Sequence, residues 1–362
     1  MNRRAFLFTA GAISLGGCIA SDPPAGTPTT TTAPTTTTTA TPTRTTPETT
    51  TPETTTETET PETPDEVEQT LNQITVHLDR TVERYAAAAG KNKGFLDLNS
   101  TSRFSFNQNA EHLYAARELF YDIETASEDQ RERQSRLRDV YWFLWWAGKS
   151  FEQLGEANRR SKNAVSRFYL GEYDQVSSRA DEIVSAVEDA KKAVSSMKEE
   201  SKASSLGAIT ALKPAAYTKT VAQIETELSV FERFADLVAS LSSHVLELDQ
   251  SFSEYLEENY DGAASSFYRL SREFEDLHGS LAETTKIAAV KEPLSEFGCM
   301  TDALANGCRV LQDAAMAGMN GLPEKQMYAE GDAKDEFEEC DLVPTELEMV
   351  TAFFDDLPRQ RT

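Results

Sequence analysis

The sequence predicts an all-α protein: an elongated antiparallel helical bundle with an internal repeat of long helical hairpins, preceded by a disordered stalk. Two observations lead to this class. Apolar residues recur at steps of three and four along most of residues 65–362, whereas the period-two alternation typical of strands is almost absent. Residues 18–64, by contrast, offer almost no side chain that could be buried.

The first residues carry three features in a fixed order. Arg3 and Arg4 are followed by an apolar run over residues 5–15, and two glycines stand directly before Cys18. This order is typical of an export signal. The apolar run is well short of the ~20 residues that a membrane-spanning helix needs.

Two motifs in this region resemble known signals. The stretch RRAFL at 3–7 resembles a twin-arginine signal, which exports folded proteins, although Asn2 stands where Ser or Thr is common. The stretch LGGC at 15–18 resembles a lipobox. The resemblance implies cleavage after residue 17, lipid on Cys18 and attachment to the outer, extracytoplasmic face of the cell membrane. The residues that carry the export signal are Arg3, Arg4, Phe6 and Leu7.

The charge of the chain restricts its partners. Without residues 1–17, 33 basic and 60 acidic residues remain, a net charge of −27. Such a chain repels nucleic acid and anionic lipid head groups, so we expect neither as a partner. Together with the signal, the acidity resembles the exported proteins of salt-loving archaea. An ordinary acidic surface protein is the alternative.

Residues 22–64 form the predicted stalk. They hold 23 threonines and nine prolines in 43 positions. These residues have almost no apolar side chain whose burial could offset the entropy lost on ordering, so we expect a disordered segment. Its content of Thr and Pro also makes it a candidate for O-glycosylation. Stiffened by proline and sugar, it could span up to ~130 Å, at ~3.1 Å per residue.

Two helices are expected at the start of the folded part, over 67–90 and from Ala110 to Ile123. The loop between them holds the sequon of the candidate glycosylation site Asn99. The apolar positions of the first helix are Val67, Leu71, Ile74, Leu78, Val82 and Tyr85.

We predict two helical hairpins, over residues 128–203 and 215–290. The apolar pattern of the first segment recurs in the second at an offset of 87 residues. Chance alignment of heptad-like helices is the alternative. Both units break at a similar turn, YLGEYDQVSS from Tyr169 and YLEENYDGAASS from Tyr255. The matched apolar pairs are Leu137 and Ile224, Tyr141 and Leu228, Leu144 and Phe231, Phe151 and Val238, Leu154 and Leu241, Val165 and Phe252, and Phe168 and Tyr255.

The first of these turns resembles the middle of a tetratricopeptide repeat. That unit is 34 residues long, whereas each helix here runs roughly 30–40, so the likeness covers only the chemistry of the turn. Pro214 and Pro293 each suit the first turn of a helix. Beyond Gly318 we expect a loop-like acidic segment, followed by a short last helix near Thr345 to Phe354.

All three tryptophans fall within one stretch, VYWFLWW at 140–146. Trp142, Trp145 and Trp146 cannot all share the core-facing side of one helix. We expect a neighbouring helix, such as the N-terminal one, to cover them. The alternative is an aromatic patch for a partner or ligand.

No catalytic or metal-binding motif is present. The four histidines have no second His or Cys at metal spacing on the same turn, so no metal site and no cofactor is expected. Phosphate loops, nucleophile elbows and HExxH are all missing. An enzyme is the less favoured class.

Three cysteines remain beside Cys18, so one stays unpaired. We expect a Cys308–Cys340 bridge and a buried free thiol at Cys299, with 299–340 and 299–308 as alternatives. A 299–308 bond would need the helix to break at 306–307, because nine helical residues place the two sulfurs on opposite faces.

The sequence therefore predicts a lipid-anchored, stalked surface protein with a noncatalytic interaction or scaffolding role. Alternatives are an extracytoplasmic binder of a small molecule or metal, and a hydrolase on a helical fold.

Overall fold

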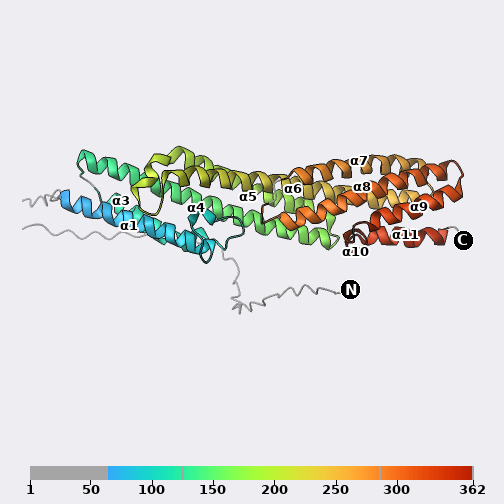
Figure 1. Ribbon diagram of the computed structural model, residues 1–362, viewed down its shortest axis with the longest axis horizontal. Helices are drawn as coiled ribbons and strands as arrows, with labels where there is room; N and C mark the ends of the chain where they lie inside the picture. Colours follow the sequence, from blue (N-terminus) through green and yellow to red (C-terminus); the bar gives the residue numbers. More distant parts are fainter. Residues whose placement is uncertain (1–63, 124–125, 285–286, 361–362) are drawn as a thin grey trace, which may run out of the picture. The chain divides into compact units, whose positions relative to one another are not determined.

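The computed structural model describes residues 64–123, 126–284 and 287–360. The chain divides into two units, 1–58 and 59–362, and the described residues all belong to the second. They fold into α-helices and two 3₁₀ turns without any strand (Figure 1), so the predicted all-α class is confirmed. The predicted signal peptide and the stalk as far as residue 63 lie outside the described residues.

The elements run in the following order. They are α1 (Pro64–Ala89), η1 (Phe95–Asp97), α2 (Phe106–Asn109), α3 (Glu111–Tyr121), α4 (Glu128–Tyr169), α5 (Tyr173–Glu200), η2 (Ala203–Ala208), α6 (Pro214–Leu256), α7 (Tyr260–Glu283), α8 (Lys291–Met319), α9 (Pro323–Glu338), α10 (Leu342–Glu346) and α11 (Glu348–Gln360).

Three antiparallel hairpins follow one another along the chain: α4–α5, α6–α7 and α8–α9 (Figure 1). Neighbouring hairpins also pack against each other, α5 on α6 and α7 on α8. Ion pairs from Lys191 to Glu232 and from Lys198 to Glu225 show that α5 and α6 are antiparallel. Pro214 begins α6 as predicted, and Pro293 lies in the first turn of α8.

One turn geometry closes all three hairpins. Its central residue has a left-handed backbone, with φ of 71° at Gly171, 62° at Glu258 and 63° at Gly321. Glycine adopts this conformation at little cost, which explains its use in two of the three turns. In each turn the next amide bonds back to a carbonyl of the preceding helix at 3.0 Å: Glu172 to Arg167, Asn259 to Glu254 and Leu322 to Ala317.

The first two hairpins share more than this turn. Phe168 lies edge-on to Tyr173 at a centroid distance of 5.3 Å, and Tyr255 lies edge-on to Tyr260 at 5.2 Å. These pairs are offset by the same 87 residues that relate the two apolar patterns. The matched positions Phe151 and Val238 are both buried. This agreement supports an internal repeat over chance alignment.

The expectation of a loop-like segment after Gly318 is wrong, because this region forms a third hairpin. Helix α9 follows the turn at Gly321, starts at Pro323 and packs against α8. Its buried side chains include Ala333 and Phe337. The sequence does not show their helical periodicity clearly, because most residues around them are charged. The last helix, α11, begins at Glu348 and packs against α6.

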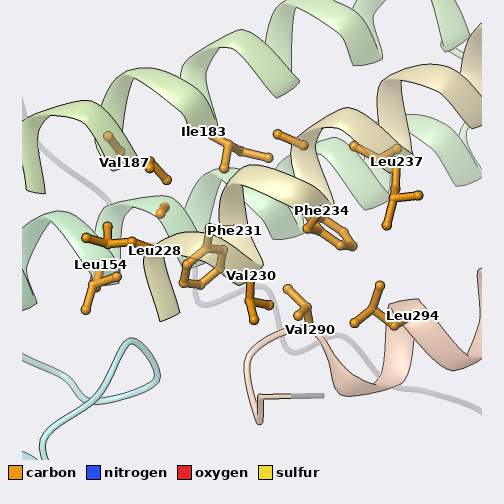
Figure 2. Packing of buried hydrophobic residues seen from close by; sticks show 14 of the residues in the cluster. Leu154, Ile183, Val187, Leu228, Val230, Phe231, Phe234, Leu237, Val290 and Leu294 are labelled. Atoms are coloured by element: carbon orange, nitrogen blue, oxygen red, sulfur yellow. The ribbon is translucent and has the colours of Figure 1, made fainter. Parts of the chain in front are cut away.

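Helix α6 carries much of the core because it buries more than one face. Phe231 and Leu228 lie toward Leu154 of α4 and Val187 of α5, whereas Val230 lies toward Val290 (Figure 2). Burial of large apolar side chains stabilises each by roughly 1.5–3 kcal/mol. The helix therefore joins the first hairpin to the elements that follow it.

The N-terminal helices pack against α4. The buried Tyr85 of α1 donates a hydrogen bond to the carbonyl oxygen of Leu144 at 3.2 Å. Gly148 permits this approach, because a Cβ there would lie 2.3 Å from the Tyr85 hydroxyl. Arg133 of α4 also pairs with Glu68 near the start of α1.

The disulfide joins Cys299 to Cys340, so the expected Cys308–Cys340 pairing is wrong. Residues at similar distances from the turn of an antiparallel hairpin lie side by side, and Cys299 and Cys340 lie 22 and 19 residues from Gly321. Helix α8 is continuous through residues 306–307, which places Cys308 on its opposite face. Cys308 is a buried free thiol whose pKa is raised by desolvation, and Cys299 is exposed rather than buried.

The repeat predicts matched core positions. Phe151→Ala and Val238→Ala should each lower the free energy of unfolding by about 2–4 kcal/mol, because each leaves a cavity in a packed interior. Denaturant unfolding measures the loss. Leu170→Ala is the control: its side chain is 66% exposed, and we expect a change within ~0.5 kcal/mol. A near-zero effect at either core position would contradict the packing.

The disulfide predicts a second loss of stability. Replacing Cys299 and Cys340 together with serine should cost about 4 kcal/mol in the chain-entropy model, because the bridge closes a separation of 41 residues. Denaturant unfolding of the oxidised protein and the double variant measures it. Peptide mapping without reduction should give the 299–340 link, with Cys308 alkylated only after unfolding. A 308–340 peptide would refute the pairing.

Candidate functional site: an aromatic cleft between α3 and α4

A cleft of ≈ 560 Å³ lies between α3 and the first half of α4. Its lining includes all three tryptophans that the sequence suggests as a candidate partner patch. All three tryptophans are half-buried, so neighbouring helices cover them only in part. The lining residues are Arg117, Phe120 and Tyr121 of α3, and Arg138, Tyr141, Trp142, Trp145 and Trp146 of α4.

The position of the tryptophans follows from the helical period of α4. Tyr141 and Leu144 face the core, so the indoles beside them fall toward its edge. Ring contacts from α2 and α3 cover Trp145, where Phe106 of α2 lies edge-on at 4.9 Å. Tyr114 lies edge-on to Trp145 at 5.6 Å, and Phe120 lies edge-on to Tyr141 at 6.0 Å.

The rings pack into one cluster. Trp142 and Trp146 are nearly parallel, with centroids 6.2 Å apart, and Tyr141 lies edge-on to Trp142 at 4.9 Å. Such aromatic pairs each contribute about 0.5–1.5 kcal/mol beyond their buried area, so each ring stabilises the position of its neighbours. The indole Nε1 of Trp146 is buried and has no hydrogen-bond partner within the described part of the chain.

Two arginines give the cleft its charge. The guanidinium of Arg138 lies 5.5 Å from the ring centre of Phe120, and that of Arg117 lies 5.7 Å from the ring centre of Tyr121. Neither arginine forms an ion pair within residues 64–123, 126–284 and 287–360. Most other described arginines lie beside a carboxylate, whereas no ion pair balances the charge of these two. Arg117 donates from Nε and Nη2 to the Tyr121 hydroxyl at 3.4 Å.

The chemistry of the cleft suits binding rather than catalysis. The eight lining side chains include no serine, cysteine, histidine or carboxylate. Burial raises the pKa of Tyr141 to about 12, and the nearby Arg117 opposes that shift only partly. The phenol therefore stays protonated at neutral pH and can act as a hydrogen-bond donor or as apolar surface.

The other predicted site residues lie elsewhere. Arg3, Arg4, Phe6, Leu7 and Cys18 fall outside the described residues, so export and lipidation stay predictions. Glycosylation of Asn99 also stays a prediction.

Asn99 is half-buried in the loop before α2, and both the nitrogen and the oxygen of its side-chain amide form hydrogen bonds. Its Nδ2 donates to the carbonyl of Asp97 at 3.0 Å, and its Oδ1 accepts hydrogen bonds from the backbone amide and hydroxyl of Thr101.

Two clusters of potential metal ligands escaped the sequence analysis. In the first, the Nδ1 atoms of His77 on α1 and His112 on α3 lie 3.2 Å apart. In the second, His244, Glu247 and Glu273 present ligand atoms within 4.8 Å of one another. His77 and His112 come from different helices, so spacing along one helix gives no signal for that pair. In the second cluster Glu273 lies on α7, whereas His244 and Glu247 lie three residues apart on α6, a spacing that a search for His and Cys alone passes over.

A second exposed apolar surface lies around the third turn. Met319 is 51% exposed and Tyr328 is 69% exposed, and Met316, Leu322 and Met327 are also exposed. Among the described contacts, none of these side chains takes part in ring stacking or in a cation–π contact, whereas the side chains of the cleft do both. We therefore treat the cleft as the candidate site.

No helix in the described part of the chain is both long enough and apolar enough to cross a membrane. In comparisons with known proteins, no family model, no curated protein and no solved structure matches this chain.

Proposed function

We propose that this protein is a lipid-anchored, noncatalytic interaction module at the outer face of the cell membrane, and that the aromatic cleft between α3 and α4 binds a partner protein. The cleft carries this proposal, because it combines exposed indole edges with two arginines that have no carboxylate partner. Tryptophan, tyrosine and arginine are the side chains that dominate the energetics of protein interfaces.

The chemistry of the cleft indicates the kind of partner. Flat aromatic walls accept proline rings and extended backbone, as in grooves that bind proline-rich segments. Arg117 and Arg138 favour carboxylates beside such a segment. We therefore infer an extended, proline-containing acidic segment of the partner as the occupant.

The sequence supports the location. The resemblance of residues 3–7 to a twin-arginine signal and of residues 15–18 to a lipobox implies lipid on Cys18, and the Thr/Pro-rich residues 22–64 would hold the helical part away from the membrane. An interaction module benefits from such reach because its partners lie beyond the crowded lipid surface. The acidic composition keeps the exposed helices soluble.

A small molecule is the second candidate ligand. The cleft volume of ≈ 560 Å³ falls within the range of pockets that bind small ligands, and a planar aromatic anion would suit its rings and arginines. The open position of the cleft between two helices favours the longer peptide segment.

The anchor is tested first. Cys18→Ser should release the protein from the membrane fraction or leave it unprocessed, because the lipid acceptor is gone. Fractionation of cells and the mass of the processed chain measure this. Replacing Arg3 and Arg4 with lysine should block export by the twin-arginine route. Normal processing and full membrane retention of Cys18→Ser would contradict the anchor.

The cleft is tested by site-specific photo-crosslinking in cells. A photoreactive amino acid at Tyr121, on the rim of the cleft, should capture one defined protein. The same group at Tyr328 on α9 is the matched control, because the two tyrosines are 68% and 69% exposed. The captured protein should carry its crosslink within a proline-containing acidic segment.

Variants of the cleft should remove the adduct. Trp142→Ala with Trp145→Ala should weaken binding by at least ~30-fold, the effect of losing about 2 kcal/mol at an interface hot spot. Arg117→Glu and Arg138→Glu should also weaken it, by repelling the acidic segment. Equal labelling from Tyr121 and Tyr328, or adducts unaffected by the tryptophan variants, would contradict the proposal. A small-molecule adduct at Tyr121 would favour the second candidate.

A further inference from the structure

Two imidazoles meet where α1 packs against α3. His77 and His112 are 35 residues apart in the chain, both are half-buried, and their Nδ1 atoms lie 3.2 Å apart. Their ring centroids are 5.4 Å apart, so the two nitrogens point almost directly at each other. In this state one Nδ1 carries a hydrogen and donates it to the other, because two bare lone pairs would repel.

The separation of the two nitrogens matches that of two ligands on one metal ion. Imidazole nitrogens bind Zn²⁺ at about 2.0–2.1 Å in a tetrahedral arrangement, which places two of them about 3.3 Å apart. Each ring would have to turn by roughly 35°, so that its lone pair points at the ion rather than at the other nitrogen. We infer that His77 and His112 form a binding site for a divalent transition-metal ion, of the Zn²⁺ or Cu²⁺ class, that clamps α1 to α3.

The protonation of the pair favours this use. Burial lowers the pKa of His77, and the neighbouring His112 and Arg80 lower it further. A neutral imidazole is the form that binds metal. When the ion binds, the donor imidazole loses the hydrogen on Nδ1 to water and gains one on Nε2. Both rings are then neutral ligands, and no net proton is released from the neutral pair.

The ligand set indicates the class of ion. Imidazole nitrogen suits Zn²⁺, Cu²⁺ and Ni²⁺, whereas Ca²⁺ and Mg²⁺ require oxygen ligands. The nearest acidic residue along α3, Glu111, is paired with Arg84 at 3.1 Å. Water would therefore complete the coordination, and we expect Cu²⁺ to bind more tightly than Zn²⁺.

The second cluster of potential ligands is the weaker candidate. The guanidinium Nη1 of Arg269 lies 2.6 Å from Glu247 and 2.8 Å from Glu273, where it already neutralises both carboxylates. A metal ion at His244 would have to displace that cation. At the His77–His112 pair no ion pair has to be broken.

The test uses the full-length protein prepared without a histidine tag. Calorimetric titration with ZnCl₂, and separately with CuSO₄, should give one ion per chain. Zn²⁺ at about 100 times its Kd should raise the Tm by roughly 5 °C. Electron paramagnetic resonance of the Cu²⁺ complex should show two nitrogen ligands.

Single variants locate the ion. His77→Gln and His112→Gln should each weaken binding at least tenfold and remove the Tm shift, while circular dichroism without metal stays unchanged. His278→Gln is the matched control, because this half-buried imidazole has its Nδ1 3.0 Å from the carbonyl oxygen of Gly298 and should not affect binding.

Three results would overturn the inference. One is the lack of binding at millimolar Zn²⁺ and Cu²⁺, and another is unchanged affinity in the double variant of His77 and His112. The third is loss of binding in His244→Gln, which would place the ion at the other cluster. None of these results bears on the aromatic cleft, so the two proposals fail independently.

Discussion

The burial of α6 on several faces is the constraint on which the rest of the fold depends. A helix with one apolar stripe is satisfied by one neighbour, whereas α6 presents buried side chains at adjacent positions such as Val230 and Phe231. It therefore needs partners on different sides, and it packs against α4 and α5 as well as α7, α8 and α11. Through α6 the three hairpins share a single hydrophobic core rather than forming separate two-helix units.

The aromatic cleft follows from a mismatch in length. Helix α4 spans 42 residues and α3 only 11, so α3 covers part of the α4 surface and leaves the tryptophan edges at its rim. Rings in this position are held by their neighbours yet remain accessible. Rigid, partly exposed aromatics lose little conformational entropy when they bind, which is the physical advantage of a preformed site.

The sequence predicted the helical class and the first two hairpins because their apolar pattern repeats over more than 70 residues per unit. It missed α9 because this helix is rich in charge and its turn replaces the Tyr173 and Tyr260 of the other hairpins with Pro323. The signal that could have revealed it is Gly321 followed by Pro323, a helix stop and a helix start. The wrong cysteine pairing followed from this omission, since the partner of Cys340 depends on the hairpin. The His77–His112 pair has no signature in the spacing of one helix, because packing between two helices creates it.

The tight turns also affect how the chain reaches its fold. Each long helix pairs mainly with the next one along the chain, and contacts between near neighbours in sequence close small loops and form rapidly. A hairpin can therefore assemble before more distant segments arrive. The Cys299–Cys340 bridge lies within one hairpin and crosses no boundary between hairpins. Its oxidation can follow assembly without any helix having to move, so the helices are able to pack in a reducing environment and the bond can close later in an oxidising one.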